Sequence, residues 1–460
     1  MFRITDANKK WWGLVALGLN SGLLLFDETV LGTALPTIRD DLGISGSTAH
    51  WVLSAYLLAF ASCAAIGGKI SDVIGVRAVI VAGRVVLIVA SLIAATAESA
   101  LVLIAARGLQ GVSAGFLFPI SSPTVAALFP PEHRGRAIGY LSIFSLSFLA
   151  AGPLVGGAFA DFIGWRWIFA INIPIICAVI VVSMLALTDL PATRPISRFD
   201  YVGVLPLVGG AGLLVFGLME VPDKDIATGA AVAAIVLGIM VLAYFLYFET
   251  RQPEPLVHVH LLRIPAVRAS TLSMLSGQLN KITVAVFIAL FLQDEVGLSP
   301  TNAGVITFAA VMVSPFAALP SGWIADRMGS RLPCLAGQVV ASICIIAIAA
   351  TMHMRLMVPM IAILIIWGAA MPFCLIPPLR LIFQSVPFDL RGEVGGIAST
   401  MRLFGGALAM AIGSAVLVSS GSHAAVFLSA GVIITAICVY SFLVFREEMV
   451  EPAPAQRETA

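Results

Sequence analysis

Two adjacent carboxylates, Asp27 and Glu28, lie inside an apolar stretch of the chain at residues 11–35. A charge at the centre of a membrane-spanning helix costs about 2.5–3.5 kcal/mol on insertion scales, so such residues usually face a water-filled cavity or a charged partner. A carboxylate in that setting can carry a proton or attract a cationic substrate. Adjacent helical residues point about 100° apart, so we expect that the two cannot face one cavity equally. A structural carboxylate bonded to neighbouring helices is the alternative for both.

Lys281 is a cation inside another apolar stretch, at residues 268–292, where Gln278 and Asn280 are its polar neighbours. It follows Asp27 by 254 positions. The same offset separates two copies of a G-x-I-x-D-x-x-G-x-R motif, at residues 68–77 and 322–331. Lys281 therefore occupies in the second half of the chain the place that Asp27 occupies in the first.

The elements that hold these residues must span a membrane. Of the 460 residues, 60% are hydrophobic and 11% are charged, against about 45–50% and about 25% in soluble domains. This composition excludes a soluble enzyme, a disordered chain and a fibrous protein. A span takes about 20 apolar residues, and fourteen candidates lie near residues 11–35, 49–68, 78–97, 100–129, 135–160, 165–187, 201–220, 227–248, 268–292, 302–322, 332–352, 356–385, 392–418 and 423–445. They are too long and too uniformly apolar for barrel strands, so we predict an all-α membrane protein.

Basic residues orient these spans. With the N-terminus taken as cytoplasmic, the cytoplasmic segments hold seventeen Lys and Arg residues and the outer segments hold four, which follows the positive-inside rule. We therefore expect a multi-pass protein of the cell (inner) membrane with both termini cytoplasmic. Arg84 and Arg380 lie within two turns of cytoplasmic helix ends, and we expect their side chains to snorkel to the interface.

The net charge and the cysteines limit the classes of partner and cofactor that we expect. The net charge of +1 gives no basic surface for nucleic acid. The six cysteines form no C-x-x-C pair, so we expect buried thiols, no metal site and no cofactor. The partners that we expect are the lipid bilayer, a small-molecule substrate and protons, and we expect a monomer.

The repeated motif divides the chain into two parallel halves of six spans, related by an axis along the membrane normal. We predict a six-helix bundle at 1–190, a linker with two inserted helices at 191–263, a second six-helix bundle at 264–446 and a cytoplasmic tail at 447–460. The motif residues are predicted to form a latch between helices that breaks as the halves move. Turns with surface ion pairs, worth about 0–1 kcal/mol each, are the alternative. These residues are Gly68, Asp72, Gly75 and Arg77 in the first copy, and Gly322, Asp326, Gly329 and Arg331 in the second.

Several motifs together resemble the major facilitator superfamily, and specifically its fourteen-helix drug:proton antiporter branch. The residues that carry the resemblance are the two loop motifs above, Asp27-Glu-Thr-Val-Leu-Gly-Thr-Ala-Leu-Pro36, Arg107-Gly-Leu-Gln-Gly111, Gly152-Pro-Leu-Val-Gly156 with Gly139 upstream, and Gly164-Trp-Arg-Trp-Ile-Phe-Ala-Ile-Asn-Ile-Pro174. Phe148 and Gly32 depart from the pattern, which usually has a glycine and an asparagine there. Glu28 and Lys281 are additions to it.

The resemblance implies roles for these residues. Proton coupling would involve Asp27, Glu28 and Arg107, with an interhelical hydrogen-bond donor as the alternative for Arg107. The first helices of both halves line the central cavity in this superfamily, so Lys281 would be a counter-ion of Asp27 or Glu28 that a substrate or proton displaces. A purely structural or snorkelling Lys281 is the alternative. The full set of cavity candidates is Asp27, Glu28, Gln278, Asn280, Lys281 and Arg402, and for Arg402 a packing role is equally open.

The glycines of the fifth span also have a physical interpretation. Gly152 and Gly156 form a G-x-x-x-G pair that permits close helix contact, and Pro153 removes a backbone hydrogen bond and favours a kink. Such a helix between the two halves would seal one side against leak; generic packing is the alternative.

These features predict a proton-coupled secondary transporter that exports drugs or amphipathic small molecules by alternating access. The chain contains no G-x-x-x-x-G-K-[ST] or H-E-x-x-H motif, so we expect no enzyme. A channel and an intramembrane enzyme are the remaining alternatives. The family implies lipophilic cationic drugs, yet Lys281, Arg107 and Arg402 outnumber the two intramembrane acids. An exporter of an anionic or zwitterionic metabolite is therefore the competing prediction.

Overall fold

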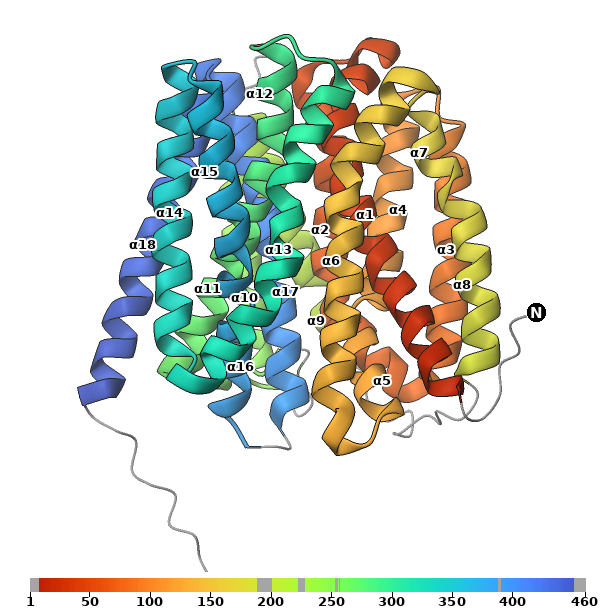
Figure 1. Cartoon of the computed structure of the whole chain (residues 1–460), viewed down its shortest axis with the longest axis vertical. Helices are drawn as coiled ribbons and strands as arrows, with labels where there is room; N and C mark the ends of the chain where they lie inside the picture. The colour runs from red at the N-terminus through yellow and green to blue at the C-terminus, as the bar shows by residue number, and fades with distance from the viewer. Residues whose placement is uncertain are drawn as a thin grey trace, which may run out of the picture.

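The computed structural model is built from helices that run along one common direction (Figure 1). It describes residues 8–187, 201–221, 228–252, 255, 257–387 and 390–450, and no strand occurs within these ranges. Helices of the first half, red to yellow, lie on one side, and most of those of the second half, green to blue, lie on the other. α1 begins and α18 ends at the lower end of this view.

Each half consists of six spans, several of them broken. The first half holds α1 (Lys9–Leu42), α2 (Gly46–Ile74), α3 (Val76–Ala95), α4 (Ala100–Leu117), α5 (Ser121–Leu128), α6 (Pro131–Phe162), α7 (Arg166–Ala170) and α8 (Asn172–Ala186). The inserted pair is α9 (Tyr201–Glu220) and α10 (Thr228–Glu249). The second half, after η1 (Val259–Arg263), holds α11 (Pro265–Ile282), η2 (Thr283–Phe287), α12 (Ile288–Asp294), α13 (Pro300–Met328), α14 (Arg331–His353), α15 (Met357–Ala370), η3 (Met371–Cys374), α16 (Ile376–Gln384), α17 (Arg391–Ser420) and α18 (His423–Val450).

The predicted spans are helical throughout the chain. Thirteen of the described helical segments are long and apolar enough to cross a membrane. The remaining predicted span, at 49–68, lies within the 29 residues of α2, a helix about 44 Å long at 1.5 Å per residue. That length exceeds the hydrocarbon core of about 30 Å. The predicted boundaries at residues 190, 263 and 446 stay predictions, since residues 188–200 lie outside the described part and α18 continues to Val450.

α2 and α13 begin at the upper end of Figure 1, and a serine side chain caps the first turn of each. The hydroxyl of Ser45 accepts a hydrogen bond from the Thr48 backbone N–H (3.2 Å) at the start of α2. Ser299 does the same for Asn302 (3.3 Å) at the start of α13. Such caps satisfy backbone donors that a helix leaves unpaired in its first turn. α1 ends at Gly43, whose φ of 61° is left-handed, a conformation that glycine adopts without steric cost.

The first helix of each half lies in the centre of the protein. Every residue of α1 from Asn20 to Pro36 is buried, and so is every residue from Ser273 to Leu292 in α11, η2 and α12. η2 is a π-helical turn, a rare insertion that is frequent at functional sites. The inserted helix α9 contacts α2 and α17, whereas α10 packs on α9. The pair therefore lies outside the two central helices.

The two halves touch at their upper ends. The Asp161 carboxylate at the end of α6 accepts a hydrogen bond from the Thr301 backbone N–H of α13 (2.8 Å). Gln293 of α12 donates to the Thr33 carbonyl of α1 (3.0 Å). His50 of α2 lies 2.6 Å from the Ser414 hydroxyl of α17. Helices α1, α2 and α6 of the first half are therefore joined here to the second half.

Candidate functional site

A buried ion pair joins α1 to α4 inside the first half. Nη1 of Arg107 lies 2.8 Å from Oδ2 of Asp27, and their side chains are 0% and 2% exposed. Nη2 of Arg107 also donates to the Asp27 backbone carbonyl (3.2 Å). Asn172 of α8 donates to the other carboxylate oxygen of Asp27 (3.3 Å). Among the described residues, the polar contacts of the Asp27 carboxylate are thus all within the first half.

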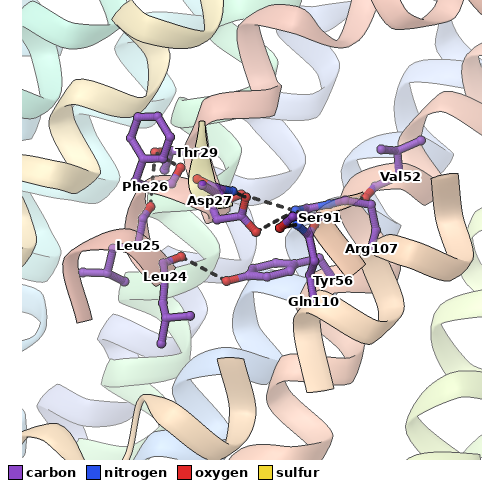
Figure 2. A network of polar contacts seen from close by, with 11 residues as sticks. Leu24, Leu25, Phe26, Asp27, Thr29, Val52, Tyr56, Ser91, Arg107 and Gln110 are labelled. Carbon is purple, nitrogen blue, oxygen red and sulfur yellow. Dashed lines mark hydrogen bonds and ion pairs between the residues drawn. The ribbon is translucent and has the colours of Figure 1, made fainter. Parts of the chain in front are cut away.

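Arg107 also contacts residues at three further positions of the same half (Figure 2). Its Nη1 donates to the side-chain carbonyl of Gln110 (2.7 Å), one turn away on the same face of α4. Its Nε donates to the Val52 carbonyl of α2 (3.2 Å). The guanidinium carbon lies 4.3 Å from the ring centre of Tyr56, a distance suited to a cation–π contact. Arg107 can therefore hold its position even when Asp27 loses its charge.

The second carboxylate, Glu28, pairs across the two halves. Nζ of Lys281 on α11 lies 2.9 Å from Oε1 of Glu28, and the side chains are 7% and 0% exposed. Gln278, one helical turn before Lys281, donates to the same oxygen at 2.5 Å. The predicted counter-ion contact is therefore present, and its carboxylate is Glu28. Asn280 points elsewhere, since its side-chain carbonyl accepts a hydrogen bond from Trp367 of α15 (2.5 Å).

Arg402 on α17 is the second cation near this pair. It is half-buried, and its helix packs against α11, where Gly406 lies next to Gln278. Its guanidinium carbon lies 4.8 Å from the ring centre of Phe118, just beyond the end of α4. Arg402 therefore contacts the first half through an aromatic ring, and it brings an excess positive charge to the pair.

The G-x-x-x-G pair of α6 packs against α1. A Cβ added to Gly152 would lie 2.1 Å from the hydroxyl of Thr29, and one added to Gly156 would lie 1.9 Å from the carbonyl of Val30. Real Cβ atoms do not approach other atoms that closely. These glycines therefore set the distance between α6 and the helix that carries both buried carboxylates.

Pro153 leaves a backbone acceptor that α1 satisfies. A proline has no N–H, so the carbonyl four residues earlier, at Leu149, loses its helical donor. The Thr29 hydroxyl donates to the Leu149 carbonyl (2.9 Å), and the Thr33 hydroxyl donates to the Pro153 carbonyl (3.0 Å). Two threonines one turn apart on α1 thus bind the irregular part of α6.

The repeated loop motif contains a glycine in an unusual conformation in each copy. Gly75 has φ 87° between α2 and α3, and Gly329 has φ 79° between α13 and α14, values that favour glycine over any residue with a Cβ. The placement of Gly68 and of the Asp72 side chain lies outside the described residues. Arg77 is half-buried in the first turn of α3.

In the second copy, Asp326 forms an ion pair with Arg380 of α16, a partner that the sequence did not indicate. Arg331 begins α14, and Gly322 on α13 has nothing within 4 Å of an added Cβ. Asp326 and Arg380 are 63% and 35% exposed, so their pair joins two helices of one half near its surface.

Arg84 lies elsewhere than predicted. Its side chain is completely buried, so the prediction that it snorkels is wrong. Its Nη2 donates to the backbone carbonyl of Asn20 (2.9 Å), and its Nε donates to the side-chain carbonyl of the same residue (3.0 Å). Asn20 in turn donates to the Leu117 carbonyl (3.0 Å) at the end of α4. Arg84 therefore makes hydrogen bonds with α1 inside the protein in place of the predicted contact with the membrane interface.

The sequence of the chain matches a known family over most of its length. A family model described as Major Facilitator Superfamily matches residues 17–259 and 269–460. The chain belongs to the major facilitator superfamily. The pairing of two six-span halves with the first helix of each at the centre agrees with this assignment, and the chain is accordingly a membrane transporter.

Named relatives within the major facilitator superfamily include antibiotic exporters. The tetracenomycin C resistance and export protein of Streptomyces glaucescens is 28% identical over 407 residues, covering 88% of this chain and 75% of that protein. The cephamycin export protein of Amycolatopsis lactamdurans is 30% identical over 407 residues, covering 85% and 81%. The solved structure of a POT family transporter in complex with 5-aminolevulinic acid has a TM-score of 0.72 at 16% identity, covering 95% of this chain and 97% of that one. That likeness concerns the fold.

Three members of the polar network in this major facilitator transporter were not among the predicted site residues. Gln110 was recognisable, because it follows Arg107 by three positions and so shares its helix face. Its amide also donates to the Ser91 hydroxyl of α3 (3.0 Å). Tyr56 and Asn172 lie on other helices, and only the packing of α2 and α8 against α1 and α4 brings them to the site.

Proposed function

We propose that this chain is a proton-coupled exporter of drug-like amphipathic molecules, a drug:proton antiporter that works by alternating access. The observation that carries the proposal is the placement of two buried ion pairs on consecutive residues of α1. Asp27–Arg107 lies within the first half, and Glu28–Lys281 joins the halves. The export functions in the names of the two relatives support the same substrate class.

Proton transfer at Asp27 has a defined consequence in this arrangement. A proton from the outer water binds a carboxylate oxygen of Asp27, which neutralises that charge and ends the ion pair with Arg107. Arg107 keeps its bonds to Gln110 and to the Val52 carbonyl. Because Glu28 is the next residue of α1, a shift of α1 at Asp27 also moves Glu28. The proton leaves Asp27 to the cytoplasm when the halves have moved.

The upper end of Figure 1 is the outer side in this proposal, with both termini in the cytoplasm and the protein a monomer in the inner membrane. The seventeen-to-four distribution of basic residues supports this orientation. The 1–190 and 264–446 bundles are the moving units, and residues 191–263 connect them. The upper-end contacts close the outer side in this conformation.

The test is transport by Asp27→Asn in proteoliposomes that are acidic inside, with the fluorescent quinolone norfloxacin as the probe. We expect the gradient-stimulated part of norfloxacin uptake to fall by about 5- to 150-fold, the range that typical coupling free energies of about 1–3 kcal/mol produce. Asparagine keeps the size of the side chain and can still accept a hydrogen bond from Arg107. A fall in gradient-stimulated uptake therefore reports the removal of the proton-binding carboxylate. Glu98→Gln is the matched control, because Glu98 is exposed. Gradient-driven uptake by Asp27→Asn at the level of this control would remove Asp27 from the coupling mechanism.

A further inference from the structure

We propose that the Glu28–Lys281 pair is the binding site for the head group of a zwitterionic substrate. A substrate ammonium would bind Glu28 and Gln278, and a substrate carboxylate would bind Lys281 and Arg402. This inference rests on the proposed export function and names the substrate class that the site selects. Glu28 and Lys281 are additions to the motifs by which the chain resembles its family.

Unpartnered polar atoms mark this site as incomplete. Oε2 of Glu28 and Oε1 of Gln278 are buried and have no hydrogen-bond partner within the described residues. Glu28 is 2% exposed and Gln278 is completely buried. Buried polar atoms in proteins are almost always hydrogen-bonded, and both of these atoms are acceptors. A ligand that fills the site must therefore bring donor N–H groups, as an ammonium does.

The charges around the pair require an anion as well. The site contains one carboxylate, Glu28, and the cation Lys281 is paired with it. A second cation, Arg402, lies on α17, which packs against α11 next to Gln278. A ligand with only a positive charge would engage Glu28 and leave the buried Lys281 and the half-buried Arg402 without an anion, which is unfavourable. A ligand with only a negative charge would leave the two acceptor atoms unpartnered. A zwitterion satisfies both sets of groups.

The location of the pair between the halves explains how such a ligand would act. Glu28 lies on α1 and Lys281 on α11, so any movement that separates these helices must break their 2.9 Å contact. Breaking it without replacement leaves two uncompensated buried charges. A zwitterion gives each residue a new partner of opposite sign, so the halves can separate while each charge stays paired. A purely structural ion pair would place no such requirement on the ligand.

Three probes of one scaffold separate the charge classes. Norfloxacin carries a carboxylate and a piperazine amine. Its methyl ester keeps only the positive charge, and its N-acetyl derivative keeps only the negative charge. Binding of each to the detergent-purified full-length protein is followed by fluorescence anisotropy of the quinolone. We expect norfloxacin to bind about 10- to 100-fold more tightly than either derivative, as the loss of one charge-assisted hydrogen-bonded contact implies.

Two variants assign the preference to the two residues. Lys281→Met should reduce the advantage of norfloxacin over its methyl ester to the part that Arg402 supplies. Glu28→Gln should remove the advantage of norfloxacin over the N-acetyl derivative. The double variant, which has no charge at either position, should bind norfloxacin and its N-acetyl derivative within about threefold of each other and keep only the part of the preference over the methyl ester that Arg402 supplies. Glu98→Gln is the control and should keep the wild-type order.

The outcomes distinguish this inference from the proposed function. Equal binding of the three probes to the wild-type protein, or the same preference in the double variant as in the wild type, overturns the zwitterion site. Gradient-driven norfloxacin uptake that depends on Asp27 would still support the exporter in that case. Conversely, selective norfloxacin binding together with uptake that ignores the pH gradient would contradict proton-coupled export and leave the zwitterion site in place.

Discussion

Arg107→Leu is expected to destabilise the protein and to abolish gradient-driven transport together. The substitution leaves the Asp27 carboxylate, 2% exposed, with Asn172 as its remaining side-chain donor among the described residues. Removing one partner of a buried ion pair costs about 3–5 kcal/mol, because the other charge stays uncompensated. Thermal unfolding in detergent measures the stability, and norfloxacin uptake into acid-inside proteoliposomes measures the coupling.

A double variant separates stability from coupling. Arg107→Leu combined with Asp27→Asn removes both charges, so most of the lost stability should return, while transport should stay uncoupled from the pH gradient. Arg166→Leu is the matched control. Arg166 pairs with Asp41 at 2.8 Å, but the two side chains are 39% and 46% exposed, so the loss should stay below about 1 kcal/mol. A stable double variant that is still driven by the gradient would make Arg107 an interhelical hydrogen-bond donor and no more.

Helix geometry predicted that Asp27 and Glu28 could not face one cavity equally, and the structure bears this out. Asp27 bonds within the first half and Glu28 bonds to the second. The repeat offset placed Lys281 at the height of this pair along the helices. It did not determine which carboxylate Lys281 would meet, because the rotation of α1 about its own axis depends on packing against α4, α6 and α11. That packing is a property of the whole fold and of no single motif.

Long side chains near helix ends were the least predictable part of the site. Arg84 and Arg380 share the same sequence context, a basic residue within two turns of a helix end. Arg84 is buried against Asn20, whereas Arg380 is partly exposed and pairs with Asp326. Their different positions arise from the partners on α1 and α13, which are 64 and 54 residues away in the chain. Hydropathy fixes where a helix spans, but it does not report such contacts.

Gly157→Ala is expected to open the upper end of the protein. A Cβ at Gly157 would lie 2.2 Å from the Pro300 carbonyl of the other half, and a backbone carbonyl can yield only if the halves move apart. Overpacking of this kind costs about 1–3 kcal/mol, which changes a two-state ratio by about 5- to 150-fold. Gly304→Ala tests the same interface from the opposite side, since its Cβ would lie 2.4 Å from the Pro153 carbonyl.

Spin labels at Leu101→Cys and Val358→Cys can follow this opening, because both residues are largely exposed and lie in different halves. The background carries Cys63→Ser and Cys177→Ser, which removes the two cysteines that are not buried. Both glycine variants should increase the population with the longer distance between the labels.

Controls on the same helix separate opening of the interface from general damage to α6. Gly139→Ala should leave the distance distribution unchanged, because an added Cβ there meets nothing within 4 Å. Gly156→Ala should lower thermal stability without a specific opening, since its contact is with Val30 of the same half. If Gly157→Ala and Gly304→Ala both kept the wild-type distances, close packing of α6 on α13 would not be what holds the upper end closed. The seal would then rest on the polar contacts of α1 and α2 with α12 and α17.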